Sequence, residues 1–263
     1  DQLSFALIFN QPYGATVEYT TPGYLLSGTS AHVYSSELAA VGRFKLNDAF
    51  SIHAGVRHIT AHGDLTLVFP GAYSTTYSRD SDTGWLVGAA YEKPEIALRA
   101  ALTYASATHF NMAGTLGNGS ATAPQSLTLD LQSGIAADTL LFGQIRWTDW
   151  TDATIDDSIV GNVVSYTDDV VTYSVGVGRK FSDNLSGAVT LGYERSEGTP
   201  ASNLAPTDGY VSLGVGGSYT MDKVKISAGV RYYQAGDATT SGIGAQFNNN
   251  HAFGAGLKVG FNF

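Results

Sequence analysis

The chain has no cysteine and few charged residues. Without cysteine, disulfide bonds and thiolate metal sites are excluded. Charged residues make up 14% of the 263 positions, whereas a soluble globular domain carries about 25%. The formal net charge of −9 argues against a nucleic-acid partner, because phosphate recognition needs a basic patch.

Long apolar runs are also missing. No stretch approaches the roughly 18 consecutive apolar residues that a transmembrane helix needs. A chain too apolar for water and too interrupted for membrane helices fits a transmembrane β-barrel, in which only alternate residues face lipid. The first residue is Asp and no signal peptide is present, so we expect a mature form or a fragment of a longer chain.

What the sequence does contain is alternation of apolar and polar residues with a period of two. In 223–234, Val224, Ile226 and Val230 point one way, and Lys225 and Arg231 point the other. Such alternation predicts a strand with one apolar face. The sequence therefore predicts an all-β fold, a transmembrane antiparallel up-and-down barrel formed as a single domain over residues 1–263. Its twelve expected strands are 2–10, 33–46, 49–61, 83–92, 95–106, 126–136, 138–150, 170–182, 185–195, 208–220, 223–234 and 250–263.

The connections alternate between short and long, as is typical of bacterial outer-membrane barrels, whose long loops lie outside the cell. Short turns are expected at Asn47-Asp48, Lys93-Pro94, Ala137-Asp138, Asp183-Asn184 and Met221-Asp222. Long polar loops are expected at 11–32, 62–82, 107–125, 151–169, 196–207 and 235–249. This order puts the C-terminus in the periplasm. The terminal Phe263 closes an alternating strand, which resembles the signal that barrel-assembly machinery recognises.

Basic residues collect on the positions assigned to the barrel lumen. Nine of the 14 lie there: Arg43, Lys45, Arg57, Arg99, Arg146, Lys180, Lys225, Arg231 and Lys258. One interpretation is that they attract an anionic solute such as a carboxylate. The alternative is that they pair with the few lumenal acids, mainly Glu37, Asp130 and Glu194, and fill the barrel.

The residues of an enzyme or a metal site are not assembled in the sequence. No HExxH zinc pattern and no GxSxG elbow occur. His62 and Asp64 share a face of an extended segment, but no nucleophile accompanies them. The acidic stretch 149–157 offers oxygen ligands for Ca²⁺ without the spacing of an EF-hand, which favours a solvated outer loop, bridged by divalent cations to lipopolysaccharide. We therefore expect no catalytic activity, no cofactor and no metal.

Aromatic residues recur near the expected strand ends, which is typical of the aromatic girdles at the two membrane interfaces. The girdle candidates are Tyr13, Tyr19, Tyr24, Trp85, Tyr104, Trp147, Trp150 and Tyr173. The alternative is that these aromatic residues form a stack that binds ligand, and we favour the girdles.

The end of the first strand contains two residues that disfavour sheet pairing. Pro12 cannot donate to a ladder and Gly14 weakens one, so pairing is expected to fail between Asn10 and Gly14.

Several segments, taken in order, resemble the FadL family of outer-membrane transporters for long-chain fatty acids and other hydrophobic compounds. These segments are the Asn10–Gly14 turn, Ser36-Glu37-Leu38, the run 44–52, Asp82-Thr83-Gly84-Trp85, the run 88–92, Leu102-Thr103-Tyr104 and Trp147-Thr148-Asp149-Trp150. The final hairpins and the aromatic C-terminus agree with the family pattern. The similarity covers nearly the whole chain, but no single motif is long.

The resemblance implies a fourteen-stranded family barrel with an N-terminal plug, of which this chain lacks the plug and the first two strands. It further implies capture of a hydrophobic ligand in a groove between two outer loops, here 62–82 and 107–125, by Leu65, Leu67, Phe69, Phe110, Met112 and Leu116. Release would be sideways, through a gap beside the kinked first strand at Asn10, Pro12 and Gly14. A monomer is expected, and the exact cargo, fatty acid or aromatic hydrocarbon, is left open.

Two further functions remain alternatives. A general porin for small hydrophilic anions would use the basic lumen and conduct anions steadily. A barrel hydrolase would need His62, and no catalytic constellation in the sequence supports it.

Overall fold

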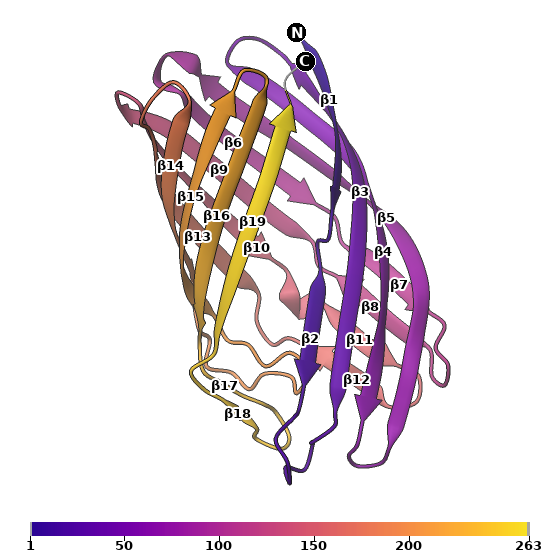
Figure 1. Ribbon diagram of the computed structural model, residues 1–263. Coiled ribbons are helices and arrows are strands. Elements are labelled where there is room, and N and C mark those ends of the chain that lie inside the picture. The colour runs from indigo at the N-terminus through magenta and orange to yellow at the C-terminus, as the bar shows by residue number, and fades with distance from the viewer. Residues whose placement is uncertain (1, 262–263) are drawn as a thin grey trace.

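Figure 1 shows the computed structural model, which describes residues 2–261. One antiparallel sheet dominates it, and each of twelve strands in this sheet pairs with the next one along the sheet. The twelve are β1 (Leu3–Asn10), β3 (Ser30–Lys45), β4 (Phe50–Leu67), β5 (Tyr73–Lys93), β6 (Leu98–Ala105), β9 (Ser126–Ala136), β10 (Thr139–Thr148), β13 (Val170–Lys180), β14 (Leu185–Glu194), β15 (Tyr210–Met221), β16 (Val224–Ala235) and β19 (His251–Phe261). The predicted up-and-down barrel of twelve strands is confirmed, while Phe263 lies outside the described residues.

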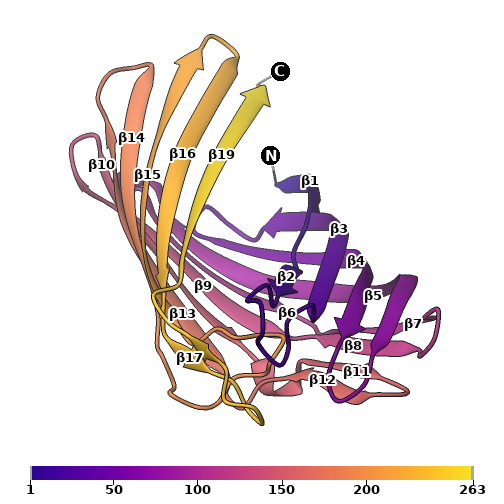
Figure 2. The same cartoon turned by 60° about the horizontal axis from the view of Figure 1, so that its bottom comes forward.

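The sheet curves so that its two edge strands, β1 and β19, face each other, and both termini lie at the same end (Figures 1 and 2). A short strand, β2 (Gly14–Glu18), continues the line of β1 and pairs with β3. In the described part of the chain, no helix is long and apolar enough to cross a membrane.

The outer face of the sheet carries exposed apolar side chains. Along β4, Phe50, Ile52 and Val56 are 50%, 47% and 56% exposed, whereas the intervening Ser51 and Arg57 are buried on the inner face. A water-soluble protein rarely exposes a continuous apolar band of this kind, but a barrel in lipid requires one. The period-two pattern of the sequence therefore corresponds to a lipid face and a lumenal face.

The five short turns lie where the sequence predicts them, at the end of the barrel that holds the termini. Three of them contain a residue with positive φ, Ala97 (50°), Asp138 (55°) and Asp222 (48°). Aspartate tolerates this left-handed conformation better than most residues do. The turn after β5 contains a 3-10 helix, η1 (Pro94–Ile96). This end is called the short-turn end below, and the opposite end is called the long-loop end.

The prediction that 62–82 is a long polar loop is wrong. Strand β4 continues to Leu67 and β5 begins at Tyr73, which leaves a connection of only five residues, 68–72. The alternation persists here with its polarity reversed, because His58, Thr60 and Asp64 point outward while Ile59 and Leu65 are buried inside. Beyond the membrane the outer face of a strand meets water. The outward side chains of an extended hairpin are therefore polar, and its sequence resembles that of a polar loop.

The expected loops 107–125 and 151–169 are not irregular either. They contain β7 (Thr108–Met112), β8 (Gly119–Ala123), β11 (Thr154–Asp157) and β12 (Gly161–Ser165), which form a second sheet in the order β12-β11-β8-β7. A 3-10 helix, η2 (Trp150–Asp152), precedes β11, and loop 235–249 holds the two-residue strands β17 (Ala238–Thr239) and β18 (Gln246–Phe247). At the long-loop end this second sheet lies across the barrel from β2 and β3 (Figure 2).

A hydrophobic core forms between the barrel wall and the second sheet. Its buried members come from both and from the loops at this end: Tyr19, Leu26, Ile59, Ala61, Leu65, Tyr77, Phe110, Met112, Ala123, Val164, Leu204 and Ala245. The long-loop end is thus a packed region, and the candidate site lies beside it.

Candidate functional site

A cavity of about 490 Å³ lies inside the barrel at the long-loop end, between the wall and the second sheet. The apolar part of the lining of this main cavity comes from β2, β3 and β4 and from the second sheet, and includes Ala15, Val33, Ala61, Phe110, Ile155 and Val164. The polar part comes from β10, β13 and β14, and includes Gln144, Arg146, Thr148, Thr172 and Glu194. The aromatic side chains of Tyr13, Trp150 and Tyr166 complete the lining. An apolar pocket with a few convergent polar groups is the usual form of a small-molecule site.

The apolar part of the lining depends on how β7 is anchored. β7 does not extend the β5 ladder; instead, two carboxylates of β5 accept hydrogen bonds from its backbone. Asp82 accepts from the N–H of His109 (2.7 Å) and Asp80 accepts from that of Asn111 (2.6 Å). Phe110 lies between them and alternation turns its ring to the opposite side, where it is 3% exposed and lines the cavity. Charge-assisted hydrogen bonds of this length are strong, so the wall is well fixed.

The polar part of the lining is a row across three neighbouring strands. Arg146 of β10 pairs with Thr172 of β13, which pairs with Glu194 of β14. Directly paired residues project on the same face, and all three side chains line the cavity. Within the described residues the only hydrogen bond of the Arg146 side chain is to the Ser126 hydroxyl (3.3 Å), and neither Arg146 nor Glu194 has an ion-pair partner within 4 Å. The cavity therefore holds one guanidinium and one carboxylate that do not neutralise each other directly.

The pairing between the edge strand and β3 is interrupted beside the cavity. Asn10 pairs with Glu37 and Gly14 pairs with Tyr34, so the three residues Gln11, Pro12 and Tyr13 face only two on β3. The sequence places its expected interruption at the same positions. The Ser35 hydroxyl fills the gap in the ladder, because it accepts a hydrogen bond from the Tyr13 N–H (2.9 Å) and donates one to the Tyr13 carbonyl. Pro12, Tyr13 and Gly14 all line the main cavity.

The six residues expected to bind ligand do not form one surface. Leu65, Phe110 and Met112 are buried members of the hydrophobic core, and Leu67 packs against it. Phe69 and Leu116 are 44% and 62% exposed in the connections 68–72 and 113–118. Of the six, only Phe110 lines the main cavity.

Three of the five lumenal arginines form ion pairs with glutamates, and two of these three share one carboxylate. Arg43 and Arg99 bind the two oxygens of Glu92, at 2.7 and 3.1 Å. Arg57 binds Glu37 at 2.6 Å, and both side chains are nearly buried. Arg231 lies 5.9 Å from the ring centre of Tyr233 in a cation–π arrangement. Pairing with lumenal acids therefore accounts for Arg43, Arg57 and Arg99, and Arg146 and Arg231 remain available to a solute.

The histidine and aspartate groups do not form a hydrolase dyad. Asp64 accepts a hydrogen bond from His32 (2.7 Å), while His62 stacks on Tyr34 with ring centres 5.2 Å apart. Among residues 2–261, no group of three or more His, Cys, Asp or Glu side chains is arranged to hold a metal ion.

Within the acidic stretch 149–157, Asp157 anchors the second sheet to the barrel. Asp157 accepts hydrogen bonds from the hydroxyls of Tyr73 (2.7 Å) and Tyr77 (2.8 Å) and from the N–H groups of Ile159 and Val160. Burial raises the pKa of Asp157, but these four hydrogen bonds outweigh it and hold the pKa below its usual range. The ionised carboxylate thus ties β11 to β5.

The sequence does not single out Tyr166, and it favours a girdle over a ligand-binding stack for Trp150. In the structure the Trp150 ring packs on Tyr166 with centres 4.7 Å apart, and both line the main cavity. Tyr13 lines the cavity and Tyr19 is buried in the core, so these two are not girdle residues either. The signal that distinguishes them is position: all lie in segments 11–19 and 150–166, between the strands that cross the membrane.

Comparisons with known proteins identify solved structures that share this fold. No protein-family model and no curated protein matches the sequence. Solved structures do match. A FadL homologue of Pseudomonas aeruginosa superposes with a TM-score of 0.74 at 16% identity, over 98% of this chain and 73% of that one. The toluene transporter TodX of Pseudomonas putida gives 0.69 at 13% identity, over 98% and 78%. The toluene transporter TbuX of Ralstonia pickettii gives 0.69 at 12%, over 100% and 80%. The chain therefore has the fold of the FadL-type transporters.

Proposed function

We propose that this protein carries hydrophobic small molecules, long-chain fatty acids or similar compounds, passively across the bacterial outer membrane. The observation that carries the proposal is the main cavity, which joins an apolar wall to a short polar row inside a barrel with a lipid face. The transport of toluene and related compounds by proteins of the same fold supports it.

Capture begins at the long-loop end, which we assign to the cell exterior because bacterial barrels keep their long loops there. The exposed apolar residues at its tips, Phe69 and Leu116, make first contact with the ligand. The ligand then enters the main cavity and packs against Phe110. In this orientation the C-terminus lies in the periplasm, and the protein is a monomer whose outer rim contacts lipopolysaccharide. The barrel-assembly machinery recognises the chain through Phe263.

Release is sideways into the membrane, past the interruption at Asn10, Pro12 and Gly14. The support for this step is that Pro12, Tyr13 and Gly14 line the cavity itself. The wall between cavity and membrane here is held by Ser35 rather than by a continuous backbone ladder. Breaking two hydrogen bonds of a hydroxyl costs about 1–3 kcal/mol, which is a small barrier to transient opening.

Deletion of Pro12 tests the lateral route. It leaves Gln11 and Tyr13 opposite Ser36 and Ser35, two residues facing two, so β1 and β2 pair with β3 as one uninterrupted strand. We expect uptake of radiolabelled ethylbenzene into cells producing this variant to fall to the level of cells without the protein. Binding of ethylbenzene to the purified variant in detergent should be unchanged, because the cavity remains.

The matched control is Pro12→Ala, which keeps the extra residue and should keep transport. If the deletion variant transports as fast as the unaltered protein, lateral release is wrong. If the unaltered protein neither binds nor transports any apolar compound, the proposed function itself is wrong.

A general porin for hydrophilic anions is the second candidate, and one observation favours it. A further cavity of about 600 Å³ toward the short-turn end is lined by Arg99 and Arg231, and shares Gln144 with the main cavity. The carboxylates of Glu92, which pairs with Arg99, and of Asp130, which lines the same cavity, reduce the positive potential along this path. The hypothesis that the protein is an anion porin therefore depends mainly on Arg231.

A further inference from the structure

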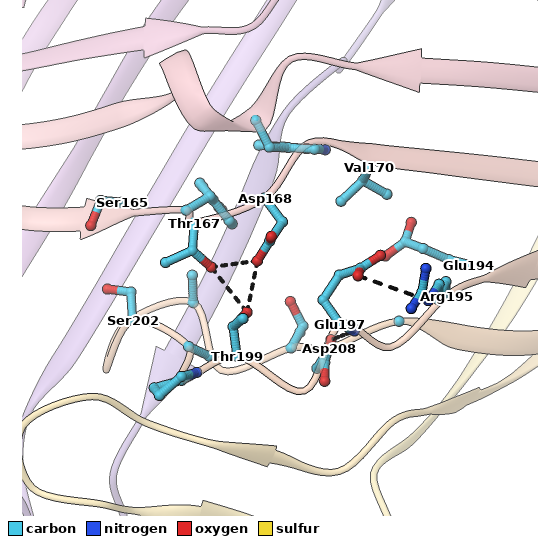
Figure 3. Close-up of a pocket in the computed structure, with 17 residues that line it drawn as sticks. Ser165, Thr167, Asp168, Val170, Glu194, Arg195, Glu197, Thr199, Ser202 and Asp208 are labelled. Atoms are coloured by element: carbon cyan, nitrogen blue, oxygen red, sulfur yellow. Dashed lines mark hydrogen bonds and ion pairs between the residues drawn. The ribbon is translucent and has the colours of Figure 1, made fainter.

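A second, polar cavity lies against the main one. It has a volume of about 210 Å³ and is formed by the turn between β12 and β13, the end of β14 and the loop 195–209 (Figure 3). Trp150, Tyr166 and Glu194 line both cavities, so these three side chains make up the wall between them. We call the smaller cavity the antechamber.

The antechamber is ordered by hydrogen bonds between its own loops. The Asp168 carboxylate accepts from the hydroxyls of Thr167 (2.6 Å) and Thr199 (2.8 Å), which joins the β12–β13 turn to the loop 195–209 (Figure 3). These two donors hold the pKa of Asp168 below its usual range. Asp208 closes the other side, where it accepts from the N–H groups of Glu197 and Gly198.

The charges around the antechamber are mostly negative. Its charged lining residues are Asp168, Glu194, Glu197, Asp208 and a single base, Arg195. Arg195 is largely exposed, and its ion pair within residues 2–261 is with Glu197, at 3.8 Å. An anion that enters this way meets a repulsive potential, because a cavity lined by one sign of charge concentrates that field.

The polar row of the main cavity continues this pattern. Glu194 stands at the dividing wall, and Arg146 stands two strands further on, about 10 Å away at the usual spacing between strands. A carboxylate on a ligand would be drawn to Arg146 and repelled by Glu194. An uncharged group that both donates and accepts hydrogen bonds suits both residues.

We propose that the antechamber and the Arg146–Thr172–Glu194 row select hydrophobic molecules with an uncharged hydroxyl or amide end over free carboxylates, and that Glu194 is the specificity-determining residue. This inference rests on the proposed function and narrows its substrate class from fatty acids and other hydrophobic compounds to the uncharged ones. Ligand enters through the antechamber when the Trp150–Tyr166 pair separates. It then lies with its apolar body on Phe110 and its polar end on the row.

The test uses four ligands with one apolar body: ethylbenzene, 4-ethylbenzyl alcohol, 4-ethylbenzoate and 4-ethylbenzylammonium. Each competes at neutral pH with a fluorescent hydrocarbon probe bound to the purified protein in detergent. We expect the alcohol to bind about tenfold more tightly than the carboxylate, as repulsion between like charges in a partly buried site predicts. Glu194→Gln should raise the affinity for 4-ethylbenzoate by about the same factor and leave that for ethylbenzene unchanged.

Asp156→Asn is the matched control, because it removes one negative charge at the long-loop end from a side chain that lines neither cavity; it should not alter the equilibrium preference. Tightest binding of the carboxylate or the ammonium ion by the unaltered protein overturns the inference, as does an unchanged preference in Glu194→Gln. If Glu194→Gln does not fold, the double substitution Asp168→Asn with Asp208→Asn should speed association of 4-ethylbenzoate, and an unchanged rate overturns the inference. Binding of ethylbenzene separates the two proposals: if it binds and the carboxylate is preferred, only this inference fails.

Discussion

At the scale of single residues, Phe110 and Phe69 illustrate how two similar candidates acquire different roles. Phe110 is 3% exposed on the cavity wall, fixed between two backbone groups that Asp80 and Asp82 hold. Phe69 is 44% exposed in the connection between β4 and β5. A buried ring on the cavity wall gives contact area to a bound ligand and so raises the equilibrium affinity. An exposed ring at a loop tip instead raises the rate at which ligand associates.

Substitution of the two phenylalanines should therefore have distinct effects. Phe110→Ala should weaken equilibrium binding of ethylbenzene about tenfold, and should lower the free energy of unfolding by about 3–5 kcal/mol because a large buried side chain is lost. Phe69→Ala should leave the equilibrium affinity unchanged and slow association. Probe displacement and stopped-flow mixing measure the two quantities, and a urea titration measures stability. Equal losses of affinity in both variants would contradict this assignment.

At the scale of elements, the second sheet matters because it forms one wall of the main cavity. Asp80 and Asp82 join β7 to the barrel, and Asp157 joins β11 to it by accepting hydrogen bonds from the hydroxyls of Tyr73 and Tyr77 of β5. The same carboxylate caps the N–H groups of Ile159 and Val160 in the β11–β12 turn. One ionised side chain thus joins two hairpins that come from distant parts of the sequence.

Asp157→Asn should loosen this link. The amide has one acceptor oxygen in place of two, and its NH₂ group would face donors. We expect faster hydrogen exchange at the amides of Ile159 and Val160 and weaker ligand binding, with the barrel strands unchanged. Asp156→Asn is a suitable control, since its carboxylate contacts only Asn162 within the described part of the chain. Unchanged exchange at Ile159 would refute the role of Asp157.

The pKa shift of Asp157 gives the same prediction a pH dependence. Because the folded pKa lies below the ordinary 3.8, the stabilising contribution is present above that value and is lost as pH falls through the lower, folded pKa. Ligand binding should therefore not vary through this group between pH 5 and about 8, and should decline only in stronger acid.

At the scale of the whole molecule, sequence and structure agree where the membrane imposes its pattern. The twelve strands and five short turns follow from alternation with exposed apolar residues such as Ile52 on one face. Beyond the membrane the outward side chains are polar and the inward ones apolar, as with His58 and Asp64 outward and Leu65 inward on the outer half of β4, so the sequence pattern there wrongly predicts a loop. A search for alternation of either polarity would extend β4 and β5 correctly.

The candidate site was only partly predictable for a related reason. Arg146 and Glu194 were both assigned to the lumen from alternation, but their common row depends on the register of β10, β13 and β14. Register follows from pairing along whole strands and not from local pattern. The Trp150–Tyr166 pair depends on how η2 and β12 fold over the barrel, which no short motif encodes.

The charges that line the lumen determine which ions the barrel could conduct. A porin for anions needs a continuous water-filled path with unpaired positive charge, but Arg43 and Arg99 share Glu92, and Arg57 is bound to Glu37. In the same lumen the Phe142 ring lies over Gly176, where even a Cβ atom would meet it at 2.5 Å. The antechamber adds acids at the long-loop end.

We therefore expect no steady anion-selective conductance when the purified protein is inserted into planar bilayers. Glu92→Gln would free two arginines without changing the size of the side chain, and it should shift any residual current toward anions. Phe142→Ala should raise the current without altering its selectivity, since it removes bulk and not charge. Steady anion-selective current through the unaltered protein would instead make the porin the better reading, and would assign Arg231 and Arg146 to ion conduction in place of ligand binding.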